Sequence, residues 1–225
     1  MGLGALVLAV SALIQYLIVF AFGEAILGAQ SGVTVEELAT NGHLLAVATC
    51  ATGVLCPMLI LLLAQVRQGI GVREYLGLRV LPWRSLFDWV GIGIVVALAI
   101  DGIMLVLERE LIPEFMVDIH GTAENLPLFW IALIVGAPLF EEFLFRGFLF
   151  RGWLDTRLRA TGTILLTSAL WTLIHVQYDA IQLVVIFVYG IVLGLARYRT
   201  GSLITPLVIH GAINLLALIQ VTLVV

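Results

Sequence analysis

Long apolar runs dominate this chain and dictate that it folds inside a membrane. Five stretches reach the 17–25 apolar residues that a helix needs to cross a bilayer, and they are 3–27, 44–66, 86–107, 126–150 and 203–224. A further block, 163–196, is interrupted only by Gln177-Tyr178-Asp179. That block is too long for one helix, so we expect two short helices joined by a tight turn. Because lipid cannot satisfy exposed backbone groups, the spans must be helical. The sequence predicts an all-α polytopic transmembrane bundle of about seven spans, with six and eight as the alternatives.

The composition leaves little room for a separate soluble domain. Hydrophobic residues make up 62% of the chain and charged residues 12%, and the mean hydropathy is +1.15. We therefore expect residues 1–225 to form a single integral membrane domain whose main partner is the lipid bilayer. The net charge is −4 and no basic cluster is long enough to follow a phosphate backbone. The charge pattern therefore predicts that no nucleic acid is a partner.

The charges also predict an orientation, because cytoplasmic loops of membrane proteins carry the excess of basic residues. The arginines on one set of loops are Arg67, Arg73, Arg79, Arg84, Arg151, Arg157, Arg159, Arg197 and Arg199. The opposite loops hold Glu36, Glu37, Glu108, Glu110, Glu114, Asp118 and Glu124 against the single basic residue Arg109. We expect the arginine side and the N-terminus to be cytoplasmic. The segment 72–84 is too short and too charged to span, so it is predicted to lie at the interface with Trp83 as an aromatic anchor.

Three charged residues interrupt the run at 126–150. Glu141, Glu142 and Arg146 lie within six residues of one another, and an ionisable side chain in hydrocarbon costs at least about 2.5 kcal/mol. Glu142 and Arg146 are spaced i,i+4, so they share a helix face and can form an ion pair. Glu141 is rotated by about 100° from Glu142 and has no such partner on its own helix. The spacing therefore indicates that Glu142 and Arg146 form a structural ion pair. Glu141 is left as a free carboxylate that can act as a general base.

Other polar residues lie at the same expected depth on later helices. His210 and Asn214 are spaced i,i+4, and His175 follows the run that begins near Thr163. At 1.5 Å per residue, Glu141, His175 and His210 each lie about 15–18 Å from the cytoplasmic start or end of their helices. Their agreement in depth predicts that they meet in one site. His210 and Asn214 together could hold a developing oxyanion.

The three motifs resemble those of one protein family. Glu-Glu-x-x-x-Arg, Trp171-x-x-x-His175 and His210-x-x-x-Asn214, in this order on late spans, resemble the CPBP or Abi family of CAAX-processing and bacteriocin-processing intramembrane endopeptidases. The resemblance covers about residues 125–220, which would be the catalytic core. The Leu-Gly-Leu-Arg segment at 76–79 is similar to the family's amphipathic lead-in. Trp171 departs from the phenylalanine that the family has more often, although the position stays aromatic.

The resemblance implies a role for each motif residue. Glu141 resembles the general base that activates water, assisted by His175, while His210 and Asn214 resemble the oxyanion-binding pair. Glu142 and Arg146 match the supporting motif residues. Such a mechanism needs no cofactor, yet a glutamate with two histidines would also suit zinc with one open position. The zinc ligands would then be Glu141, His175 and His210. We favour the metal-free mechanism.

The sequence thus predicts a multi-pass endopeptidase of a cell membrane, plasma or inner, from a prokaryote. It would hydrolyse a peptide bond in a hydrophobic or lipidated substrate. One alternative is a non-catalytic immunity or scaffold protein of the same family that binds a partner through the same cavity. Another is a proton-coupled transporter with Glu141 and His175 as a relay, against which stands the absence of repeated halves.

Overall fold

The protein folds as a stack of helices. A computed structural model describes residues 2–26, 38, 40–66 and 69–225, and throughout these ranges the regular elements are all helical. In chain order they are α1 (Gly2–Ile26), α3 (Gly42–Val66), α4 (Val72–Leu76), α5 (Trp83–Val106), α6 (Glu114–Gly121), α7 (Leu126–Ile131), η1 (Ala132–Gly136), α8 (Ala137–Glu142), η2 (Phe143–Leu149), α9 (Phe150–Leu154), α10 (Arg159–Leu173), α11 (Ala180–Thr200) and α12 (Ile204–Val224).

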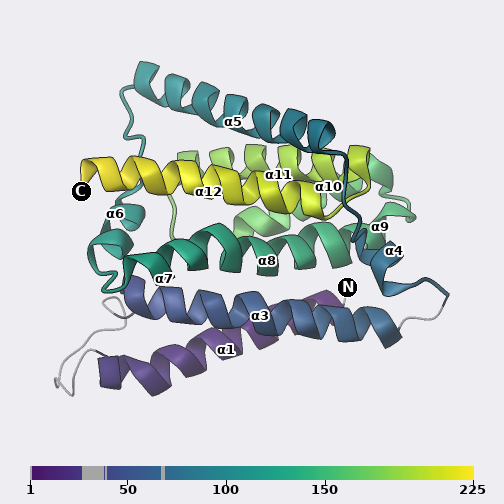
Figure 1. Ribbon diagram of the computed structural model, residues 1–225, viewed down its shortest axis with the longest axis horizontal. Coiled ribbons are helices and arrows are strands. Elements are labelled where there is room, and N and C mark those ends of the chain that lie inside the picture. The colour runs from purple at the N-terminus through teal and green to yellow at the C-terminus, as the bar shows by residue number, and fades with distance from the viewer. Residues whose placement is uncertain (1, 27–37, 39, 67–68) are drawn as a thin grey trace.

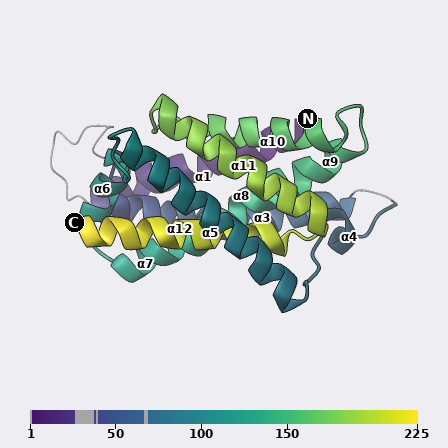
Figure 2. The same ribbon diagram turned by 90° about the horizontal axis from the view of Figure 1, so that it is seen from above.

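The long helices lie roughly side by side, and α8 sits in the middle of the stack. Figure 1 shows α5 on one side and α1 on the other, with the layer of α10, α11 and α12 and then α7 and α8 between α5 and α3. Seen from above, α5 crosses over α11 and α12 (Figure 2). α8 contacts both α3 and α12. Polar residues on α8 are therefore shielded from lipid by neighbouring helices.

The number of spans is about five to six and not the seven that the sequence predicts. Five helices in the described residues are long and apolar enough to cross a membrane: Gly42–Val66, Trp83–Val106, Leu126–Leu154, Ala180–Thr200 and Ile204–Val224. A shorter apolar helix, Ala5–Ile18, lies within α1. Four of these five helices start and end within four residues of a predicted span, and the other, Ala180–Thr200, overlaps the block 163–196.

The difference in span number comes in part from the predicted span 3–27, where the shorter helix Ala5–Ile18 lies, and in part from the block 163–196. It does contain two helices joined by a turn, but α10 has 15 residues and is therefore about 22 Å long, short of the roughly 30 Å hydrocarbon core. α11 takes the rest of the block and runs on to Thr200. Asp179 begins it with a capping box, because its carboxylate accepts from the Gln182 backbone N–H while the Gln182 side chain accepts from the Asp179 N–H.

The segment predicted at the interface contains α4 and the first residues of α5. Trp83 and Phe87 stack on each other and are both largely exposed, as expected for an aromatic anchor at headgroup level. The N-terminal end of α1 lies at the same end of the molecule as α4 and α9, while the C-terminus lies at the opposite end (Figure 1). Of the charges used for the orientation, Arg67, Glu36 and Glu37 lie outside the described residues.

Candidate active site

The helix that carries the two glutamates is wound in an unusual way. Residues Leu126–Leu154 form one continuous run, yet the α-helical turn α8 is flanked on both sides by π-helical segments, η1 and η2. π-Helical turns inside α-helices are rare and occur frequently at functional sites. Here they set the directions in which Glu141 and Glu142 point.

Pro138 frees a backbone carbonyl about two turns before the glutamates. A proline has no N–H to donate, so the partner that residue 138 would otherwise supply is missing for one carbonyl, that of Ile134 in α-helical pairing or that of Leu133 in π-helical pairing. The Asn214 side-chain amide donates to the Leu133 carbonyl at 2.8 Å. α12 comes close at this point, since a Cβ added at Gly211 would lie 2.9 Å from the Ile134 carbonyl oxygen. The amide of Asn214 thus joins α12 to the glutamate helix.

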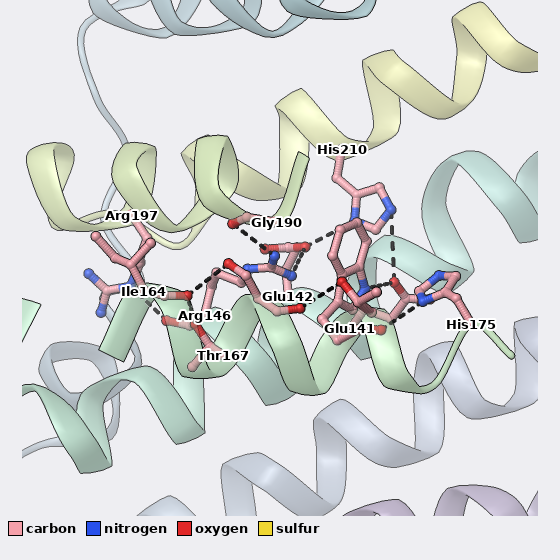
Figure 3. A network of polar contacts seen from close by, with 12 residues as sticks. Glu141, Glu142, Arg146, Ile164, Thr167, His175, Gly190, Arg197 and His210 are labelled. Atoms are coloured by element: carbon pink, nitrogen blue, oxygen red, sulfur yellow. Dashed lines mark hydrogen bonds and ion pairs between the residues drawn. The ribbon is translucent and has the colours of Figure 1, made fainter. Parts of the chain in front are cut away.

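Glu142 and Arg146 form a fully buried ion pair. The Arg146 Nη1 donates to Glu142 Oε1 at 3.0 Å, and both side chains have 0% exposure. A second guanidinium nitrogen donates to the Gly190 carbonyl of α11 at 3.2 Å. Figure 3 shows the two side chains turned toward each other in the centre of a wider polar network. The pair therefore ties the glutamate helix to α11.

His210 connects this ion pair to Glu141. Its Nδ1 lies 2.9 Å from Glu142 Oε1, and its Nε2 lies 3.9 Å from Glu141 Oε2. A carboxylate only accepts hydrogen bonds, so the ring hydrogen is on Nδ1 and points at Glu142. In the neutral ring, Nε2 then offers a lone pair on the side of Glu141.

Glu141 points away from the ion pair toward the two histidines. Its side chain is 12% exposed, and its Oε2 accepts a hydrogen bond of 2.5 Å from the indole N–H of Trp171. Glu141, His175 and His210 lie beside one another in Figure 3. The neighbours of the Glu141 carboxylate are thus the neutral indole N–H of Trp171 and the two histidines.

His175 lies just beyond the end of α10. Its Nδ1 is 2.7 Å from the Trp171 carbonyl oxygen, so Nδ1 carries the hydrogen and donates it. The ring stacks on Tyr178, with centroids 6.1 Å apart. The Nε2 atom of His175 is then left as an acceptor, as in His210.

All four predicted residues face one cavity. It has a volume of about 940 Å³, and its lining includes Glu141, His175, His210 and Asn214. Gln177 and Tyr178 line it as well, whereas Asp179 caps α11. A cavity of this size lies near the upper end of the range for ligand pockets, about 300–1,000 Å³.

The zinc alternative does not fit the arrangement of donors. No group of three His, Cys, Asp or Glu side chains is close enough to hold a metal ion in the part of the chain that the structure describes. Moreover, the Trp171 N–H donates to the Glu141 oxygen that faces His210, so a donor occupies the place where a cation would bind. The residues present therefore do not form the site of Glu141, His175 and His210 ligands considered above.

Comparison with protein families supports the reading of the motifs. Residues 123–216 match the family model described as type II CAAX prenyl endopeptidase Rce1-like. The chain carries a domain of this family. The match includes the three motifs, and it confirms the resemblance to the CPBP or Abi family. A domain of this family suggests a CAAX-type intramembrane protease. No curated protein and no solved structure matches the chain.

Sequence reasoning gave Trp171 no chemical role beyond being an aromatic motif residue. In the structure its indole donates to Glu141, and its ring contacts three further residues of the site: Arg146, His175 and His210. One signal was available in the sequence. An indole N–H buried away from the membrane interface requires an acceptor, and Glu141 was the unpaired acceptor at the matching depth.

Proposed function

We propose that the protein is an intramembrane endopeptidase that hydrolyses a peptide bond in a hydrophobic or lipidated substrate by means of an activated water molecule. The observation that carries the proposal is the carboxylate of Glu141, which lies outside the ion pair of Glu142 and Arg146 and whose Oε2 is 3.9 Å from the Nε2 of His210 in the 940 Å³ cavity. Glu141 is the general base. The Nε2 atom of His175 is an acceptor that orients the second hydrogen of the same water.

The reaction needs no covalent intermediate. Glu141 takes one proton as the water oxygen bonds to the scissile carbonyl carbon, and the carbonyl electrons move onto oxygen. The carbon–nitrogen bond of the tetrahedral intermediate then breaks, and the proton on Glu141 passes to the leaving nitrogen. The products are a carboxylic acid and an amine.

The oxyanion is stabilised from α12. Asn214 already donates one amide hydrogen to Leu133, so the other amide hydrogen is the one available to the oxyanion. His210 enters this step already as an imidazolium, with Glu142 at Nδ1, and donates to the oxyanion from Nε2 without taking part in the proton transfer. Donors held in place before the reaction stabilise developing charge without reorganisation.

The substrate reaches this site from the membrane. The arginine-rich end of the molecule faces the cytoplasm in this proposal, as the positive-inside rule requires, and the N-terminal end of α1 lies at that end. The protein belongs in a cell membrane, where a hydrophobic or lipidated peptide is enriched beside the long apolar helices.

The test is peptide hydrolysis by detergent-purified protein with Glu141→Gln. This change removes the base and keeps the size of the side chain, so kcat is expected to fall at least about 100-fold. Glu110→Gln is the matched control, because Glu110 also lines the cavity but is not part of the proposed mechanism; its kcat should stay within about twofold of wild type. Activity that survives Glu141→Gln would refute the proposal, and loss of activity with a chelator would support zinc instead.

A further inference from the structure

Trp171 occupies the centre of the proposed active site. The side chain is 3% exposed and projects from α10, a helix that carries no other residue of the mechanism. Its indole N–H donates to Glu141 Oε2 at 2.5 Å. The carbonyl oxygen of the same residue accepts from His175 Nδ1 at 2.7 Å. One residue therefore orients both the base and a histidine.

The ring of Trp171 contacts the rest of the site as well. The guanidinium carbon of Arg146 lies 4.5 Å from the ring centroid, a cation–π distance. The ring of His210 packs edge-on at a centroid distance of 5.3 Å. The indole is thus placed between the buried ion pair and the cavity.

Such a partner affects Glu141 in two ways. The terminal torsion of a glutamate is broad, so packing alone fixes the carboxylate plane poorly. In addition, Arg146 is near enough for attraction to the Glu141 charge. A carboxylate that turned toward Arg146 would form an ion pair and stop acting as a base. The indole N–H holds Oε2 from a direction that a guanidinium cannot then occupy.

We propose that Trp171 is a positioning residue for Glu141, which it holds away from Arg146 with Oε2 occupied and Oε1 directed at the attacking water. The inference rests on the function proposed above. In this proposal the indole N–H positions Glu141, whereas the rest of the ring contributes only to packing.

Trp171→Phe separates these two contributions. Phenylalanine keeps an aromatic face for Arg146 and loses the N–H. The loss of one hydrogen bond to a charged group predicts that kcat falls about tenfold while KM stays within about twofold. Trp153→Phe is the control, because Trp153 is also a buried tryptophan but lies on α9, outside the site. It should leave both constants within about twofold.

Should Trp171→Phe unfold, the nitrogen can be replaced alone. Incorporating 3-benzothienylalanine at position 171 keeps the shape of the ring and puts sulfur where the N–H was. The same loss in kcat supports the proposal. Unchanged kcat in the folded benzothienyl protein overturns it, as does a loss that appears only in KM.

A spectroscopic measurement separates this inference from the proposed function. In protein labelled with ¹⁵N-tryptophan, the indole signal that disappears in Trp171→Phe belongs to Trp171. This signal should move upfield in Glu141→Gln, since an amide oxygen is a weaker acceptor than a carboxylate, and should move less in Glu110→Gln. An unchanged signal overturns the positioning role even if the protein is a protease. A shifted signal in a protein whose Glu141→Gln variant still cleaves peptides would leave the contact intact and refute the proposed function.

Discussion

At the scale of single residues, substitutions in the ion pair of Glu142 and Arg146 are expected to lower the stability of the protein strongly. Both side chains are fully buried, so removing one leaves an uncompensated charge among apolar helices. Breaking a buried pair in this way costs about 3–5 kcal/mol. Glu142 also accepts from His210, and its loss therefore disturbs the active site at the same time.

We predict that Glu142→Gln lowers the apparent melting temperature and the kcat together. The charge of Arg146 causes the loss of stability, so the double variant Glu142→Gln/Arg146→Met should recover much of the melting temperature but not the activity. Thermal unfolding in detergent and peptide hydrolysis measure the two effects. A double variant less stable than Glu142→Gln would contradict this explanation.

At the scale of helices, the close packing of α10 on α11 positions the site. Gly190 lies where the two helices touch, and a Cβ added there would be 2.8 Å from the Cβ of Ser168. The carbonyl of Gly190 also accepts from Arg146. Separating α10 from α11 would therefore move both Trp171 and the acceptor of Arg146.

We predict that Gly190→Ala reduces activity several-fold and lowers the melting temperature, because two Cβ atoms cannot come this close. Adding Ser168→Gly removes the second Cβ and should restore both properties in part. Gly102→Ala is the control: Gly102 is on α5 with no atom within 4 Å of an added Cβ, and alanine favours a helix over glycine by about 1 kcal/mol. Full activity in Gly190→Ala alone would show that this contact can widen freely.

Much of the helix pattern could be predicted from hydrophobic length, whereas the site could be predicted only in part. The spacing of Glu142 and Arg146 indicates their ion pair because both lie on one helix. His210 and Asn214 also share a face, but their partners are on another helix: Glu142 for His210 and the Leu133 carbonyl for Asn214. Periodicity does not reveal such partners. The π-helical turns on either side of α8 likewise leave no repeat in the sequence.

At the scale of the whole molecule, the cavity has acidic side chains in its lining and no arginine or lysine among the described residues. Asp101, Glu110 and Glu141 line it, and within the described residues no arginine does; the chain has no lysine. Asp101 accepts from the neutral amide of Gln220 at 2.7 Å, a contact that leaves its charge in place. Along α12, Gln220 lies about 15 Å from His210, which corresponds to four or five extended residues of a bound peptide.

We predict a preference for substrates with a basic residue about four positions from the cleaved bond. Between otherwise identical peptides, lysine at that position should give a kcat/KM about fivefold higher than glutamate, the effect of roughly 1 kcal/mol of attraction in a partly solvated site. The difference should shrink in Asp101→Asn and in high salt. Equal rates for the two peptides at low salt would contradict it.

The paired π-helical turns around α8 have a consequence for how the chain tolerates insertions and deletions. A π-helical turn holds one residue more than ordinary winding, so η1 can take up a change of one residue without turning the start of this long helix relative to its two glutamates. Deleting Val135 would remove that extra residue and no functional side chain, and the run could then wind as an ordinary α-helix with both ends facing much as before. We expect such a shortened chain to keep its fold and much of its activity.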